Sequence, residues 1–577
     1  MVGQLAPARL RSRLAGRPDV VAVAATTLIS GIVTLWWLAS FRAGSALDID
    51  ENAYAGAAWD DAYAVTHHGL SGLWHAWLLH ADFAPLVPLT ALPIELVTGR
   101  AVVASMAFEL VYLALLLAST AAITRQLVGP RAAAVAVVVV ACSPAILDFQ
   151  RTFHFVLASA ALLTAAVAAM LASERFVRTG WAVSFVALLA RMVLARTMNV
   201  AFVPGAFAAA ALLAASSPDR RRSLRNLALS GGALVAIGAT WFGPNWRPVL
   251  DYLTSYGYGR QSHFYGKTIS PTSIEFWTRR AAQIIQGDLY LPLTILLVVT
   301  LLLAAAQMGR RRPSGPHRVE IAAVGTIVVA AYLALSSSPN QGFGFEAPLV
   351  PCIVSLAVAA IWHLDRHQVR STMCTLLLAT SSVTFVVKSD TVGFTSGTRS
   401  VTLPIFGRAI VIDDTGLIQS YVAGHGGGES DAGAMPALDE AWLGSSGGMA
   451  VALEDFAAAR GRMPIVFFAT RDPFFNTNTL GLASRFRLER TLPVGQLDPR
   501  VAGDNMLAYV ERLSDPRYGQ PNLVITGDQA ARDFDPQVTQ ASAVAAVQSL
   551  GYTPAFTMVL PDGRHLQVWW LLRGPVR

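Results

Sequence analysis

Long apolar stretches alternate with short, arginine-bearing segments over the first two thirds of the chain. A helix needs about 20 apolar residues to cross the bilayer core, and most of these stretches approach that length. They predict a polytopic α-helical membrane protein with about eleven transmembrane helices, near residues 20–41, 102–124, 132–147, 155–173, 180–196, 199–216, 227–243, 290–308, 320–337, 347–362 and 371–388. The stretches at 132–147 and 347–362 are short, which is typical of tilted, re-entrant or broken helices.

The arginines of the connecting segments predict the orientation in the membrane. If the N-terminus is cytoplasmic, every inside loop carries at least two arginines, as the excess of basic residues on cytoplasmic sides requires. These arginines are Arg125 and Arg131, Arg175 and Arg178, Arg220, Arg221, Arg222 and Arg225, Arg310, Arg311, Arg312 and Arg318, and Arg366 and Arg370. The long segments 42–101 and 244–289 then lie outside, as does everything after the last span.

Both long outer segments are predicted to be ordered. The first shows helical spacing near residues 51–66 and 70–80, and its tryptophans favour helices that lie along the membrane surface. The second is rich in tyrosine.

The character of the chain changes near residue 390, where glycines and carboxylates become common. Short apolar runs alternate there with helix-like stretches, and an Asp-Gly pair suits a tight hairpin turn. The runs are 465–468 and 523–526, the helical stretches 449–460 and 538–550, and the turn 560–563. We expect a transmembrane catalytic domain over residues 1–389 and a soluble extracytoplasmic α/β domain over 390–577.

Composition supports a membrane protein and argues against several other classes. Hydrophobic residues make up 54% of the 577 residues and charged residues 14%, whereas soluble domains carry about 25% charged residues. The net charge of +7 follows from the loop arginines, so it indicates topology and no nucleic-acid partner. The three cysteines, Cys142, Cys352 and Cys374, lie in apolar stretches and are expected to be buried thiols.

An acidic cluster, Asp48, Asp50 and Glu51, follows the first expected span. Carboxylates are costly to desolvate at a membrane edge, so three of them there indicate a site. Asp50 is either a helix N-cap, a general base that removes a proton from a sugar hydroxyl, or both. Asp48 and Glu51 either bind a divalent cation, such as Mg, Mn or Ca, or hydrate the edge of the loop.

A second group of polar residues is expected on the outer side. Asp148 forms either a local pair with Arg151 or a second acidic site beside the first, with His154 close in sequence. Arg191 and Arg196 end the fifth span against the trend of basic residues inside, so either a lipid phosphate or an internal carboxylate is their partner. Weaker candidates of the same type are Arg260, His263 and Lys267.

Several of these segments resemble one family, the GT-C glycosyltransferases, in the branch of protein mannosyltransferases and aminoarabinose lipid A transferases. The first outer loop of that family carries Asp-Glu-x-x-Tyr, which here runs from Asp50 to Tyr54. The family then has a histidine or lysine before a Pro-Leu pair, matched by His80 and residues 85–86, and a polar break matched by residues 196–199. Residues 340–351 match the family's late prolines but lack its arginine.

The resemblance covers roughly residues 20–365 and implies an inverting transfer of a sugar from a polyprenyl-phosphate donor to a glycan, lipid or protein acceptor at the bilayer. It implies Asp50 as the base, Glu51 and Asp148 near the acceptor or a metal, and Arg196 beside the leaving phosphate. The expected substrate-binding residues are Tyr54, Arg151, His154, Arg196, Arg260 and Lys267.

Two other classes of function remain open. A lipid or glycan transporter or flippase predicts internal repeats and charges inside the spans, and the unusual acids here lie at outer edges instead. A non-catalytic envelope assembly protein would tolerate Asp50→Ala, whereas an enzyme would not. The preference for arginine over lysine and the alanine-rich spans favour a bacterial plasma membrane.

Overall fold

The computed structural model describes residues 17–42, 47, 49–79, 84–99, 102–259, 262, 269–289, 291–310, 317–340, 342, 344–388, 401–405, 408–412, 435–470, 474–496, 505–515, 520–527 and 540–572. The chain forms two compact units. The helical unit comprises Met1–Trp37, Ala64–Thr98 and Ala104–Leu417, and the mixed unit comprises Leu38–Tyr63, Gly99–Val103 and Ile418–Arg577. The expected domain boundary at residue 390 lies outside the described residues.

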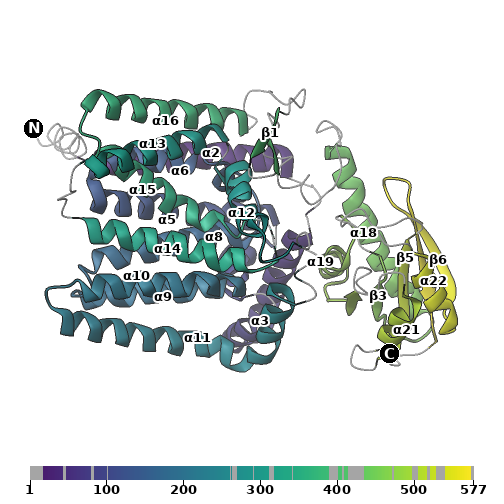
Figure 1. Cartoon of the computed structure of the whole chain (residues 1–577). Helices are drawn as coiled ribbons and strands as arrows, with labels where there is room; N and C mark the ends of the chain where they lie inside the picture. The colour runs from purple at the N-terminus through teal and green to yellow at the C-terminus, as the bar shows by residue number, and fades with distance from the viewer. Residues whose placement is uncertain are drawn as a thin grey trace, which may run out of the picture. The chain divides into compact units, whose positions relative to one another are not determined.

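The helical unit is built from apolar helices, which run roughly parallel in Figure 1 with α8 beside α9 and α10 beside α14. Their bounds are α2 (Pro18–Trp37), α4 (Leu86–Thr98), α5 (Val102–Val128), α6 (Pro130–Ala141), α7 (Pro144–Phe149), α8 (Phe155–Ala172), α9 (Thr179–Ala195), η2 (Thr197–Phe202), α10 (Val203–Ala215), α11 (Arg220–Gly257), α12 (Ile274–Gln283), η4 (Ile284–Asp288), α13 (Leu291–Arg310), α14 (Arg318–Ser337), η5 (Ala347–Leu349), α15 (Val350–Trp362) and α16 (His367–Lys388). A two-stranded hairpin, β1 (Val401–Ile405) and β2 (Arg408–Ile412), follows.

Among the described residues, seven helices are long and apolar enough to cross a membrane. They are Pro18–Ser40, Val102–Val128, Phe155–Ala172, Thr197–Ala215, Arg220–Gly257, Arg318–Ser337 and His367–Val386. The four other expected spans coincide with shorter apolar helices, at Pro130–Ala141, Thr179–Ala195, Pro292–Ala306 and Ala347–Trp362. The protein is therefore a polytopic helical membrane protein, and the count of eleven spans stays a prediction.

Small residues bring these helices close together. Helix α8 consists mostly of alanine and leucine and is buried along almost its whole length. A Cβ added to Gly205 of α10 would lie 3.0 Å from the Cβ of Ala330 on α14. Such close contacts replace the hydrophobic driving force that is absent between helices in lipid.

Two segments show how proline and glycine act here. Helix α11 continues through Pro244 and Pro248, so residues 244–257, expected to be loop, are helical. Membrane helices accommodate proline because neighbouring groups satisfy the freed carbonyls. Helix α3 (Ile49–Leu79) is kinked at Gly69, whose φ of 59° suits glycine, and this kink confirms the predicted break between two helical stretches in the first outer segment.

The mixed unit contains a five-stranded sheet in the order β4-β3-β5-β7-β6. Strand β3 is parallel to β4 and β5, whereas β7 is antiparallel to β5 and β6. The strands are β3 (Val466–Phe468), β4 (Val494–Gln496), β5 (Leu523–Gly527), β6 (Thr553–Val559) and β7 (His565–Trp570), and the helices are α18 (Met435–Ala458), α19 (Thr477–Leu488), α21 (Met506–Ser514) and α22 (Ala541–Ser549).

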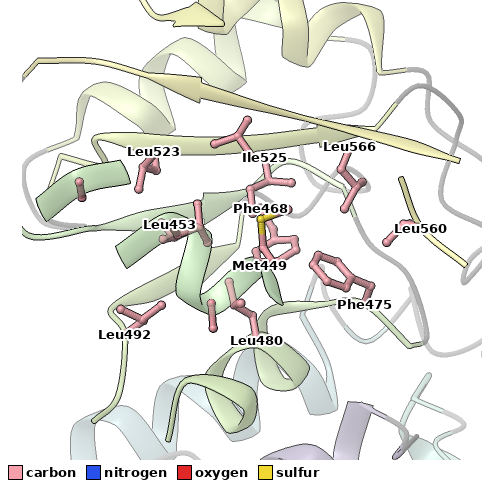
Figure 2. Packing of buried hydrophobic residues seen from close by; sticks show 14 of the residues in the cluster. Met449, Leu453, Phe468, Phe475, Leu480, Leu492, Leu523, Ile525, Leu560 and Leu566 are labelled. Carbon is pink, nitrogen blue, oxygen red and sulfur yellow. The ribbon is translucent and has the colours of Figure 1, made fainter. Parts of the chain in front are cut away.

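Alternate residues of the central strands enter two separate cores, as the period of two along a strand requires. Val466 and Phe468 pack with α18 and α19, and Figure 2 shows this cluster. Phe467, between them, packs on the other face with α21 and α22. The C-terminal part of the chain thus contains a small sheet with helices on both faces, and the expected domain over 390–577 stays a prediction.

Candidate functional site

The predicted base and its neighbours lie in the first turns of α3. Asp50 is the second helical residue, inside the first turn and partly buried, where the helix dipole stabilises a carboxylate. Glu51 is fully buried and accepts a hydrogen bond from Nη2 of Arg42 at 2.5 Å. Tyr54, one turn further along, is also fully buried. Arg42, which ends the π-helical turn η1 (Leu38–Arg42) after the first span, was not recognised from the sequence.

The proposed cation site receives no support from the described part of the chain. Asp48 lies outside the described residues, and within them no group of three or more His, Cys, Asp or Glu side chains is placed to hold a metal ion. The carboxylate of Glu51 is engaged by Arg42, and a guanidinium beside a carboxylate disfavours a cation there. No chemical step below depends on a metal. Also outside the described residues are Arg260, His263, Lys267 and His80.

In the helical unit, Asp148, Arg151 and His154 lie together where α7 ends and α8 begins. The backbone N–H of Arg151 donates to the carbonyl of Asp148 at 3.1 Å. The buried Arg151 guanidinium lies 4.7 Å from the centre of the Trp37 ring, and His154 stacks between Phe149 and Phe155. Aromatic rings therefore fix both basic side chains of this turn.

Arg196 ends α9 with an extended backbone, in the polar break noted in the sequence. Its Nη2 donates to the hydroxyl of Tyr252 at 2.7 Å. Its guanidinium also lies 4.9 Å from the ring centre of Phe155, the ring that contacts His154. The structure thus brings Arg196 and the turn at residues 148–155 together.

Arg280 of α12 forms a buried network that the sequence did not predict. Its Nη1 donates to Oε1 of Glu346 at 2.5 Å, its Nε to the carbonyl of Leu335 at 3.1 Å, and its Nη2 to the carbonyl of Asn340. The neighbouring Arg279 donates to the carbonyl of Ser338. The sequence could have indicated this arginine pair, because it lies on the predicted outer side, whereas basic residues favour the cytoplasmic side. Arg196 is an exception of the same kind.

Arg280 contacts residues 340–351, the segment that matches the family pattern except for its missing arginine. Residues 340–351 carry the late prolines without an arginine, and the guanidinium of Arg280 reaches this segment from α12. The guanidinium of Arg280 therefore lies beside this segment, although the segment itself contains no arginine.

Asp288, at the end of η4, adds a further carboxyl to this region. It is buried, and its Oδ2 has no hydrogen-bond partner among the residues that the structure describes. Burial raises the pKa of this carboxyl well above its ordinary value, and Glu346 and Asp148 raise it further, while Arg280 lowers it. The charges of Glu346, Arg280 and Asp148 thus all act on the carboxyl of Asp288.

No family model and no curated protein sequence matches this chain. Solved structures do match. Over 95% of this chain and 97% of that chain, the fold is similar to ArnT from Cupriavidus metallidurans bound to undecaprenyl phosphate, with a TM-score of 0.54 at 14% identity. The apo form of ArnT matches over the same shares with a TM-score of 0.53 at 15% identity.

A second similar structure is the archaeal oligosaccharyltransferase AglB from Archaeoglobus fulgidus, in complex with an inhibitory peptide and a dolichol-phosphate. The match covers 87% of this chain and 69% of AglB, with a TM-score of 0.51 at 11% identity. At these identities the likeness concerns the fold. This chain therefore has a fold similar to those of ArnT and AglB.

Proposed function

We propose that this protein is a membrane glycosyltransferase that moves a sugar from a polyprenyl-phosphate donor to the hydroxyl of a cell-envelope glycan, lipid or protein on the outer face of the plasma membrane. The observation that carries the proposal is the match of 95% of this chain to 97% of an ArnT structure bound to undecaprenyl phosphate. A fold alone does not establish an activity, so the residues must supply the chemistry.

The transfer requires a base, and Asp50 is the residue we assign to it. A carboxylate within hydrogen-bond reach of an acceptor hydroxyl can accept its proton as a general base. The acceptor oxygen then forms a bond to the anomeric carbon while the bond from that carbon to the phosphate oxygen breaks. The proton goes to Asp50, the polyprenyl phosphate leaves, and a single displacement inverts the anomeric centre.

The leaving phosphate requires positive charge, and Arg196 is the residue we assign to it. Tyr252 and Phe155 hold its guanidinium in one orientation. A pre-oriented cation stabilises the charge that develops on the departing phosphate without reorganising during the reaction. Arg151, fixed over Trp37, and His154 are assigned to donor binding, and Glu51 and Asp148 to the surroundings of the acceptor.

The deciding experiment measures sugar transfer by the purified protein in lipid. Synthetic polyprenyl-phosphate donors carry mannose, arabinofuranose, aminoarabinose, glucose or galactose, and wild type is compared with Asp50→Ala. The matched control is His75→Ala, an exposed position on the same helix. We expect donor-dependent product or hydrolysis that disappears only in Asp50→Ala. Absence of turnover with every donor, while Asp50→Ala still complements a deletion strain, would contradict the proposal and favour transport or scaffolding.

A further inference from the structure

Within the mixed unit, helix α19 contacts the beginning of α3. The Nδ2 of Asn478 donates to the carbonyl of Ile49 at 2.8 Å. The Nδ2 of Asn52 donates to Oγ1 of Thr479 at 3.2 Å. Ile49 and Asn52 lie on either side of the Asp50-Glu51 pair in sequence. Consecutive residues of α19 therefore hydrogen-bond to the residues just before and just after the Asp50-Glu51 pair.

A bidentate ion pair fixes the same two helices further along. Arg485 donates from Nε to Oδ1 of Asp60 at 2.8 Å and from Nη2 to Oδ2 at 2.6 Å, a geometry that gives both strength and orientation. Thr491 donates to Oδ1 of Asp60 at 3.3 Å. A Cβ on Gly56 would lie 3.2 Å from Nη1 of Arg485, so glycine gives this arginine room beside α3.

Helix α19 is itself firmly attached to the sheet. Its N-cap, Asn476, accepts hydrogen bonds from the backbone N–H groups of Asn478 and Thr479, which supports the start of the helix. Leu480 belongs to the buried core between α19 and the sheet, as Figure 2 shows. The side chains that contact α3 therefore project from a rigid element.

We propose that α19 is a positioning element of the transfer reaction: Asn478, Thr479 and Arg485 hold the first turns of α3 so that Asp50 keeps the orientation needed to accept the proton. The inference rests on the proposed function, because it assumes that Asp50 is the base. It assigns the C-terminal α/β region a role in positioning the base. The three residues act through α3 and touch no reacting atom.

The test compares the full-length variants Asn478→Ala and Arg485→Ala with Arg487→Ala, an exposed arginine on the same helix. Displacement of a catalytic group by about 1 Å costs about 100-fold in rate. We expect kcat to fall by about this factor in Arg485→Ala with KM little changed, and Arg487→Ala to behave like wild type. The exchanged pair Asp60→Arg with Arg485→Asp should recover much of the rate, whereas an effect of either residue outside this ion pair predicts no recovery.

Hydrogen–deuterium exchange provides a readout that needs no substrate. The amides of residues 49–63 should exchange faster in Asn478→Ala and Arg485→Ala than in wild type, while the amides of β3 and β5 stay protected. Unchanged exchange over 49–63, or wild-type kcat in both variants while Asp50→Ala is inactive, overturns the inference and leaves the proposed function intact. If wild type turns over no donor, the proposed function fails, and faster exchange would then show only that α19 anchors α3.

Discussion

Two arginine–carboxylate pairs in this protein share their chemistry and differ in their surroundings. In the mixed unit, Arg485 and Asp60 keep 15% and 16% of their side chains exposed. In the helical unit, Arg280 and Glu346 keep only 2% each, and backbone carbonyls surround the guanidinium. A buried charge that loses its partner pays the full cost of desolvation, whereas a partly exposed charge regains water. We therefore expect the first pair to control position and the second to control folding.

The largest effect should follow from Arg280→Ala, which leaves the carboxylate of Glu346 buried without its cation. Breaking such a pair destabilises a protein by about 3–5 kcal/mol. Thermal unfolding of the purified protein in detergent measures this loss, and the surface pair of Arg178 with Glu174 provides the control, since an exposed pair contributes at most about 1 kcal/mol. Replacing both partners, as in Arg280→Met with Glu346→Leu, should restore much of the stability. A loss no larger than that of Arg178→Ala would contradict the comparison.

Arg196 is a third buried arginine in the helical unit, but it differs from Arg280 because we assign it to the leaving phosphate of the substrate. Removing one electrostatic stabiliser of a transition state costs about 10²- to 10³-fold in kcat. We expect Arg196→Ala to lose activity to this extent while its unfolding midpoint stays near that of wild type. Tyr252→Phe, which removes only the hydroxyl that orients the guanidinium, should lose less. A variant that unfolds as readily as Arg280→Ala would instead assign Arg196 to the fold.

The smaller effect concerns the stability contributed by the partly exposed pair of Arg485 and Asp60. Arg485→Ala should lower the free energy of unfolding by less than Arg280→Ala does, because the Asp60 carboxylate regains water. The contribution should shrink further at high salt, because ions screen partly exposed charges more than buried ones. Unfolding midpoints at low and high salt, for this variant beside Arg280→Ala, measure the difference. Equal salt dependence in both variants would show that the two environments are not distinct.

Patterns within one segment predicted the helices and strands of this protein better than they predicted which distant residues contact one another. Apolar stretches located the helices, and the alternation of runs located β3 and β5, because hydropathy and periodicity act within one element. The two helical stretches predicted near residues 51–66 and 70–80 are the two parts of α3 on either side of its kink at Gly69. Pro244 and Pro248 lie beyond the predicted end of the span at 227–243, but α11 continues through them to Gly257. The carbonyl of Thr240, which Pro244 leaves without its helical partner, accepts a hydrogen bond from Nε1 of Trp77 at 3.4 Å.

The candidate site was predicted only in part for a related reason. Asp148, Arg151 and His154 are close in sequence, so their proximity was evident. The pairing of Arg280 with Glu346 joins residues 66 positions apart, and the bond from Asn478 to Ile49 spans 429 positions. Contacts of this kind depend on the tertiary fold, and no spacing rule within one segment predicts them.

The carboxyl of Asp288 makes the stability of the buried Arg280–Glu346 region depend on pH. Burial holds the pKa of its carboxyl well above the ordinary value, so above the ordinary Asp pKa of about 3.9 the folded protein retains a proton that the unfolded chain releases. The native state then binds more protons than the unfolded state, and the free energy of unfolding falls as pH rises until the pH passes the raised pKa.

Asp288→Asn removes this titration while keeping a side chain of similar shape. We expect the variant to gain stability over wild type as the pH rises from acid toward the raised pKa of Asp288, with little difference at acid pH, where the wild-type carboxyl is protonated in both states. Unfolding midpoints of the two proteins across this interval measure the effect, with Asp219→Asn, at the N-cap of α11, as the control carboxyl. A stability difference that does not change with pH would mean that Asp288 is ionised in the fold. The Arg280 network would then carry three negative groups, Asp288, Glu346 and Asp148, near one guanidinium, and Arg280→Ala should destabilise the protein more steeply at high pH than at low pH.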